Sequence, residues 1–163
     1  MSFLLITAQP KYGSLKAIDV LNDRIKAGLY PLNESTKFRR DIKAGERIFF
    51  YLGASKSKKS SYSSFRERGK SIAGEALVEG KVDEFRISRD DKEKVHADLL
   101  YVHEFLKLQQ VNLYSDAIPF ERLAGDLSFT RRSVDWRACL MGGAKRLDTE
   151  DVLLIQKNAD DNQ

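Results

Sequence analysis

The chain begins with a run of apolar residues that is too short for a helix. Residues 3–7 (FLLIT) are apolar at nearly every position, and the run ends at Pro10. A short run that is apolar on both faces is typical of a strand inside a sheet, because such a strand is covered on both sides. We therefore expect a central strand at the start of the chain.

A helical pattern follows this strand. Apolar residues recur every three or four positions from residue 15 to residue 25, and charged residues occupy the opposite face, as expected for a helix that packs on a core. Ser14 is suited to cap the start of this helix, and Gly28 is suited to end it. Residues 30–40 have no sustained period and contain Pro31, so we expect a loop there.

Two further apolar runs predict a pair of strands. Residues 48–52 (IFFYL) follow a turn at Gly45, and residues 71–78 contain Gly74. A glycine within a strand indicates a bulge or the close approach of a neighbouring backbone. The segment between the two runs offers no crossover helix unless the segment itself forms one, and this favours antiparallel pairing.

The second half of the chain predicts one long strand and two helices. Residues 97–114 fit both strand alternation and helical spacing, and their Val, Tyr and Phe content favours the strand. Residues 116–124 predict a short helix with Pro119 in its first turn. A final helix is expected at residues 148–157, with acidic residues at its start. The highly charged residues 83–94 are expected to be exposed.

The length and composition fit a single soluble domain. No repeat or linker divides the chain of 163 residues, so we expect one domain at residues 1–157 and a polar, frayed tail at residues 158–163. The single cysteine excludes an internal disulfide and any zinc site built from several cysteines. The apolar run at the N-terminus is too short for a signal peptide or a membrane span. These features predict a soluble, cytoplasmic protein without a membrane partner.

Basic residues are concentrated in one segment. The net charge is +4, a mild bias that is compatible with a polyanionic partner. Between Lys56 and Lys70 there are six basic residues and one acidic residue, Glu67. This segment is either a solvated loop or an arm that contacts phosphates, since Tyr62 and Phe65 add stacking faces to the positive charge.

Signatures of catalysis are weak. No phosphate-binding loop, dinucleotide-binding turn or nucleophile elbow occurs in the sequence. His96 and His103 are seven residues apart, which does not place them on one face of a strand, so we expect a surface or half-buried pair rather than a metal site. Cys139 lies between Ala138 and Leu140, and we expect it to be a small buried hydrophobic residue. We therefore predict that the protein is not an enzyme.

Several segments, taken in order, resemble the EVE domain, which belongs to the PUA-like superfamily and is related to the YTH and ASCH domains. The opening FLLITAQPKYGS, the turn and strand KAGERIFFYLG and the strand SIAGEALVEG are each similar to a part of the family pattern. Trp136 lies where the family often carries a tryptophan, and AKRL then leads into the last helix. The resemblance covers the chain from end to end.

This resemblance implies an α+β fold of the PUA-like type, in which a strongly bent, mostly antiparallel β-barrel has helices packed on its outside. It also implies a non-catalytic role, without cofactor or metal, in which a flipped and often modified base is held in a pocket between the barrel and the first helix. Such a pocket needs stacking faces, edge contacts and basic groups for the flanking phosphates. The expected faces are Tyr30 and Trp136, the expected edge contacts are Thr7 and Gln9, and the expected phosphate contacts are Arg39, Arg40, Lys43, Lys58, Lys59 and Arg66.

Three points stay open at this stage. The nucleic acid is either DNA or RNA. The oligomeric state of the protein does not follow from these patterns. The alternative function is a regulatory protein that binds a nucleoside-like small molecule in the same pocket. Trp136 is either a wall of this pocket or a support for the core.

Overall fold

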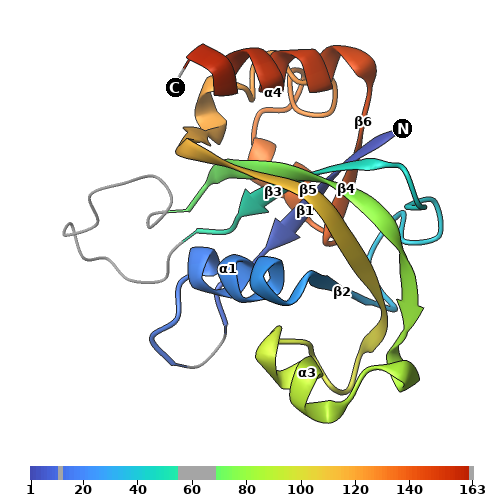
Figure 1. Ribbon diagram of the computed structural model, residues 1–163. Coiled ribbons are helices and arrows are strands. Elements are labelled where there is room, and N and C mark those ends of the chain that lie inside the picture. The colour runs from blue at the N-terminus through green and yellow to red at the C-terminus, as the bar shows by residue number, and fades with distance from the viewer. Residues whose placement is uncertain (11–12, 55–68, 162–163) are drawn as a thin grey trace.

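The computed structural model describes residues 1–10, 13–54 and 69–161, which form a curled sheet with helices outside it (Figure 1). The α-helices are α1 (Ala17–Ala27), α3 (Arg89–Lys94) and α4 (Thr149–Asp161). The strands are β1 (Ser2–Thr7), β2 (Leu29–Asn33), β3 (Arg47–Leu52), β4 (Ser71–Asp83), β5 (Val102–Pro119) and β6 (Ala144–Leu147). Short 3-10 turns, η1 (Glu84–Arg86), η2 (Phe120–Arg122) and η3 (Trp136–Leu140), lie in the connections.

The sheet is strongly bent because its two longest strands are irregular. The strand order is β2-β5-β4-β3-β1-β6, and among the described strands only β1 and β3 pair in parallel. The pairing of β4 with β5 shifts register at three places, and each such shift bends the strands. β4 and β5 therefore curl through the molecule in Figure 1 and shape the sheet into a half-barrel. The bent, mostly antiparallel sheet predicted from the sequence is confirmed, including the antiparallel pairing of β3 with β4.

Both faces of the sheet are buried. On one face, a first core cluster contains Leu5 of β1 and is covered by α1 through Leu21. On the other face, a second core cluster contains Leu4 of β1 and is covered by α4 through Ile155. The two helices accordingly lie on opposite sides of the sheet in Figure 1. β1 pairs with β3 on one side and β6 on the other, which confirms the prediction of a central strand.

The expected loop at residues 30–40 is wrong in its first part, because residues 29–33 form β2. β2 pairs only with β5, at the edge of the sheet. Proline is tolerated on an edge strand, since the amide hydrogen that it lacks has no neighbouring strand to bond. Pro31 is therefore compatible with a strand, and the buried Tyr30 and Leu32 on either side of it anchor β2 in the core.

The helix expected at residues 116–124 is also wrong. The long strand predicted at residues 97–114 exists, but β5 continues to Pro119, and only Phe120–Arg122 form a 3-10 turn. The reason is tertiary pairing: Ile118 lies opposite Ile72 of β4 and is fully buried. This pairing outweighs the helical signal of a proline followed by alternating polar residues.

The ends of the helices differ from the predictions in two places. α1 begins at Ala17 rather than after Ser14, and the Asp19 carboxylate caps it by accepting a hydrogen bond of 2.8 Å from the Lys16 backbone N–H. Gly28, with φ of 71°, ends α1 as predicted. α4 continues to Asp161, past the expected start of the frayed tail. Of the helices in the described ranges, none is long and apolar enough to cross a membrane.

Gly74 is a point of very close approach between β4 and β5. A Cβ atom at Gly74 would lie 2.5 Å from the Asn112 carbonyl oxygen and 2.9 Å from the Leu113 Cα. Both are backbone atoms, which cannot rotate away as a flexible side chain can. The close approach predicted from the glycine is confirmed, and no other residue fits this position without moving a strand.

We expect Gly74→Ala to lower the free energy of unfolding by about 1–3 kcal/mol, because the added methyl group overpacks a rigid contact. Gly80→Ala is the matched control, since it lies in the same strand and a Cβ atom there meets nothing within 4 Å. Urea denaturation of both variants measures the difference. Equal stability of the two variants would contradict the close approach.

Candidate ligand pocket

The candidate pocket lies between α1 and the ends of β1 and β2. It has a volume of about 280 Å³. Five segments that are distant in the sequence meet there: the end of β1 and the following turn, α1, β2 with the turn after it, the connection between α3 and β5, and the connection between η3 and β6. The residues that line it are Ile6, Ala8, Gln9, Pro10, Val20, Arg24, Tyr30, Pro31, Leu32, Asn33, Thr36, His96, Asp98 and Gly143.

Tyr30 lines this pocket, and Thr7 lies on the side of Tyr30 that faces away from the lining. The Tyr30 side chain is only 3% exposed and stacks on Phe50, with 5.9 Å between the ring centroids. The Tyr30 and Thr7 hydroxyl groups share a buried hydrogen bond of 2.8 Å. Thr7 is fully buried and is not part of the lining. Both hydroxyl groups therefore already have partners within the protein.

Arg24 is the cation of the pocket wall, and the sequence interpretation missed it. Its guanidinium carbon lies 4.8 Å from the centroid of the Tyr30 ring, within the range of a cation–π contact. Its Nε donates to the Val95 carbonyl at 2.9 Å, and its Nη2 donates to the His96 carbonyl at 3.3 Å. Burial lowers the pKa of Arg24, although an arginine stays protonated near neutral pH. A guanidinium has five N–H donors, so Arg24 has capacity for a ligand acceptor beyond these two bonds.

The remaining polar wall consists of Gln9, Asn33, Thr36 and Asp98. Gln9, which the sequence interpretation proposed as an edge contact, is half-buried and lines the pocket. The Thr36 hydroxyl accepts a hydrogen bond of 3.1 Å from the Asn33 backbone N–H, which closes the turn after β2. The two amide side chains carry both donors and acceptors, and such groups match the mixed hydrogen-bonding edge of a nucleobase.

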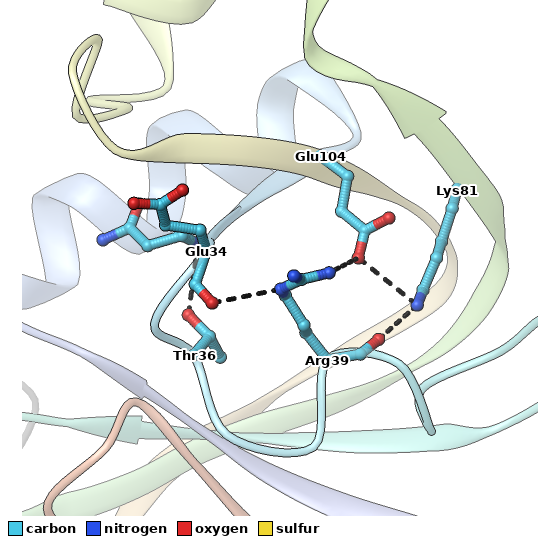
Figure 2. A network of polar contacts seen from close by, with 6 residues as sticks. Glu34, Thr36, Arg39, Lys81 and Glu104 are labelled. Atoms are coloured by element: carbon cyan, nitrogen blue, oxygen red, sulfur yellow. Dashed lines mark hydrogen bonds and ion pairs between the residues drawn. The ribbon is translucent and has the colours of Figure 1, made fainter.

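Arg39 is held inside a polar network rather than presented to solvent (Figure 2). Its guanidinium lies 3.8 Å from the Glu104 carboxylate, and Lys81 lies 3.4 Å from the same Glu104 oxygen. The Arg39 Nε also donates to the Glu34 carbonyl at 3.2 Å, and Lys81 donates to the Arg39 carbonyl. Because that Glu104 oxygen is buried, both cations offset the cost of its charge. Arg39 thus fixes the turn that carries Thr36 to the pocket.

The other expected phosphate contacts are distributed differently. Arg40 and Lys43 are exposed on the segment that follows the pocket turn. Lys58, Lys59 and Arg66 lie outside the described residues. Lys37 was not expected, but its backbone N–H donates to the Gly142 carbonyl at 2.9 Å, next to Gly143 of the pocket lining. Lys37 is exposed and lies on the same segment as Arg40 and Lys43, residues 37–43.

Trp136 lies away from the pocket lining. It is half-buried on η3 and packs against Phe120, with 4.9 Å between the ring centroids. Phe120 belongs to the second core cluster, which α4 covers, and Trp136 packs against this cluster from outside. Of residues 133–143, only Gly143 lines the pocket, and the Trp136 indole does not. The structure therefore does not bring Trp136 together with Gln9 and Tyr30.

Cys139 and the two histidines are not arranged as a catalytic or metal site. Cys139 was expected to be buried, but it is only half-buried. Its thiol donates to the Ser133 hydroxyl at 3.4 Å. His96 is half-buried and His103 is exposed, as expected. His96 contacts Asp23 at 2.7 Å. In the described part of the chain, no group of three or more His, Cys, Asp or Glu side chains could hold a metal ion.

The strongly perturbed phenols lie near α4 and not near the pocket. Burial raises the pKa of Tyr51 to about 12. Burial, together with a hydrogen bond of 2.7 Å to Glu75, raises the pKa of Tyr114 far above its ordinary value. Perturbed groups can mark catalytic sites. Here they belong to the packing beneath α4, since both tyrosines are part of the second core cluster.

Comparison with known proteins yields structural neighbours only. No family profile and no curated protein match the chain. The fold is similar to that of human THYN1 in complex with DNA that contains 5-methylcytosine, at a TM-score of 0.55 and 12% identity over 96% of each chain. It is also similar to the N-terminal domain of Staphylothermus marinus McrB, at a TM-score of 0.57 and 11% identity over 96% of this chain and 93% of that one. A protein from Pseudomonas putida is similar at a TM-score of 0.57 and 14% identity, over 98% and 99%.

These neighbours establish the fold class. The chain has an α+β, PUA-like fold, and the neighbours align with it over nearly their full lengths. The resemblance to the EVE domain that the sequence motifs indicated is confirmed at the level of fold. At identities of 11–14%, side chains at equivalent positions are mostly different. The chemistry of the pocket lining therefore follows from the residues of this chain and not from those of its neighbours.

We expect a double-mutant cycle of Thr7→Val and Tyr30→Phe to show strong coupling. Tyr30→Phe leaves the buried Thr7 hydroxyl group without this bond, at a cost of about 1–3 kcal/mol. Thr7→Val costs less, because the Tyr30 hydroxyl group keeps its interaction with Arg24. The double change removes both groups and should cost less than the sum of the two. Urea denaturation measures the cycle, with the exposed Tyr101→Phe as the control. Additive losses would contradict the buried bond.

We expect Trp136→Ala to lower the free energy of unfolding by about 1–3 kcal/mol, because the indole packs against Phe120 and is half-buried. Trp136→Phe should retain most of the stability. Affinity for any pocket ligand should be unchanged in both variants at temperatures where they are folded. A Trp136→Ala variant with normal stability and lost binding would instead place the indole at the ligand.

Proposed function

We propose that the protein binds nucleic acid and holds a single extrahelical base in the pocket between α1 and the curled sheet. The observation that carries this proposal is the size and chemistry of the pocket. Its volume of about 280 Å³ lies just below the range of ligand sites, which begins at about 300 Å³. A planar group of the size of one base fits such a volume, whereas a dinucleotide cofactor does not.

The lining supports this ligand class. An extruded base is recognised by hydrogen bonds to its edge and by flat or apolar side chains against its faces. Arg24 supplies N–H donors, while Gln9 and Asn33 supply both donors and acceptors. Ile6, Val20 and Pro31 supply apolar surface. The complex of human THYN1 with DNA containing 5-methylcytosine supports DNA with an unpaired or modified base as the first ligand to test.

Basic residues outside the pocket would contact the backbone of the nucleic acid. Lys37, Arg40 and Lys43 lie exposed on one segment that begins at the pocket turn. Lys58, Lys59 and Arg66 are further candidates from the basic segment of the sequence. In this proposal the protein is a binding module and catalyses no reaction on the base.

Binding should be strongly salt-dependent. Three phosphate contacts weaken the association constant by roughly 40-fold between about 50 and 200 mM salt, because bound counterions are released. Fluorescence anisotropy with labelled single- and double-stranded oligonucleotides, containing either cytosine or 5-methylcytosine, measures this slope. Arg40→Ala and Lys43→Ala should each reduce its magnitude by about one. No binding of any of these oligonucleotides at low salt would refute the proposal.

A bulky side chain in the pocket should abolish recognition of the base and leave the salt slope intact. Ala8 is exposed and lines the pocket, so Ala8→Trp fills the cavity without disturbing the core. Ala138→Trp, at an exposed position on η3, is the matched control. Free nucleosides are titrated in parallel. Nucleoside binding that Ala8→Trp abolishes, without any affinity for oligonucleotides, would support the small-molecule alternative.

A further inference from the structure

A rigid apolar tip stands beside the candidate pocket. It consists of Leu99, Leu100 and Tyr101, in the turn between α3 and β5, and these side chains are 43%, 84% and 54% exposed. Asp98 closes the turn. Its carboxylate accepts from the Leu100 backbone N–H at 3.0 Å, and its carbonyl accepts from the N–H groups of Tyr101 at 3.1 Å and Val102 at 2.7 Å. The two leucines are therefore held at the apex of a tight turn.

The tip is continuous with the rim of the pocket on both sides. Asp98, which precedes it, lines the pocket. Val102, which follows it, pairs with Asn33, which also lines the pocket. Consecutive Cα atoms are about 3.8 Å apart, so the apex lies one or two residues from the pocket rim. The Leu100 Cα therefore lies at most about 7.6 Å from the Asp98 Cα, which is roughly two rises of about 3.4 Å between stacked bases on one strand.

The tip also adjoins residues 34–43, the segment that follows β2 and carries several basic residues. The Glu34 backbone N–H donates to the Tyr101 carbonyl at 3.0 Å, and this bond joins the tip to the segment that carries Lys37, Arg40 and Lys43. Exposed apolar side chains next to positive charge suit a partner that combines flat apolar faces with phosphates. A stack of nucleobases has both features, whereas the apolar surface of a protein partner would not require the cations.

We infer that the tip is a wedge that enters a nucleic-acid duplex where a base has been extruded into the pocket. This inference rests on the proposed function. Extruding a base leaves a gap in the stack, and an apolar side chain inserted between base steps stabilises the unstacked duplex. Leu100, at the apex, fills the gap while the extruded base occupies the pocket beside Asp98. The wedge acts on duplexes only, because a single strand has no gap to fill.

Leu100→Ala tests the wedge by comparing ligands that differ in the cost of extrusion. We expect its affinity for a fully paired duplex containing one 5-methylcytosine to be roughly tenfold lower than that of the unmodified protein, since the gap is no longer filled. Its affinity for the single strand of the same sequence should be unchanged. A mismatch opposite the target base lowers the cost of extrusion and should restore most of the lost duplex affinity.

Two variants control for packing and charge. Leu153→Ala removes an equally large side chain that is 61% exposed on α4, across the sheet from the tip, and should have no effect. Leu100→Phe keeps an apolar wedge and should retain duplex binding. Denaturation in urea verifies that Leu100→Ala, at a position 84% exposed, is as stable as the unmodified protein.

The outcomes separate the wedge from the proposed function. If Leu100→Ala binds the paired duplex normally while Ala8→Trp does not, the wedge is wrong and the base pocket stands. If Leu100→Ala weakens single-strand and duplex binding equally, or if the unmodified protein binds only single strands, the tip is not a wedge. If the unmodified protein binds no nucleic acid, both proposals fail.

Discussion

The contact of Gly74 with the backbone of β5 is the constraint on which the rest of the structure depends. A Cβ atom there would lie 2.5 Å from a carbonyl oxygen, so β4 and β5 cross at a distance that only glycine permits. Together with the register shifts along this pair, the close crossing bends the sheet. A flat sheet would leave β2 extended at its edge, whereas the curl brings β2 beneath α1. The pocket between them is a consequence of this curvature.

Two buried or half-buried charges then fix the loops around the pocket. Arg24 joins α1 to the carbonyls of Val95 and His96, just before the turn that carries the apolar tip. On the other side, Glu104 holds Arg39 and Lys81 and thereby positions the turn after β2. Breaking such a contact leaves a desolvated charge without its partner, which costs more than the intact pair contributes. The charges therefore confer precision on the site more than they contribute to stability.

The sequence patterns predicted those elements whose formation depends mainly on neighbouring residues. The strands at β1, β3 and β4 followed from short apolar runs, and both roles of glycine at positions 28 and 74 followed from backbone geometry. β2 was missed because the tolerance of Pro31 depends on an edge position that only the tertiary structure defines. The site was harder to predict, since five distant segments supply its lining. Gln9 and Tyr30 lie in the lining, and their roles stay predictions. Arg24 had one usable signal: it lies three residues after Leu21, on the apolar face of α1, where a charge must find a partner.

The division between a polar pocket and an apolar tip has a consequence for selectivity. A pocket alone discriminates bases by their edges, but extrusion from a duplex costs the same stacking energy before any edge is read. In the two proposals, the wedge lowers this cost for every sequence and so contributes affinity without discrimination. The pocket then supplies the discrimination without having to supply all of the affinity. At 11–14% identity, the neighbours share the fold of this chain but few of its side chains. The curvature must be kept, because it creates the cavity, whereas the lining from five separate segments can change one side chain at a time.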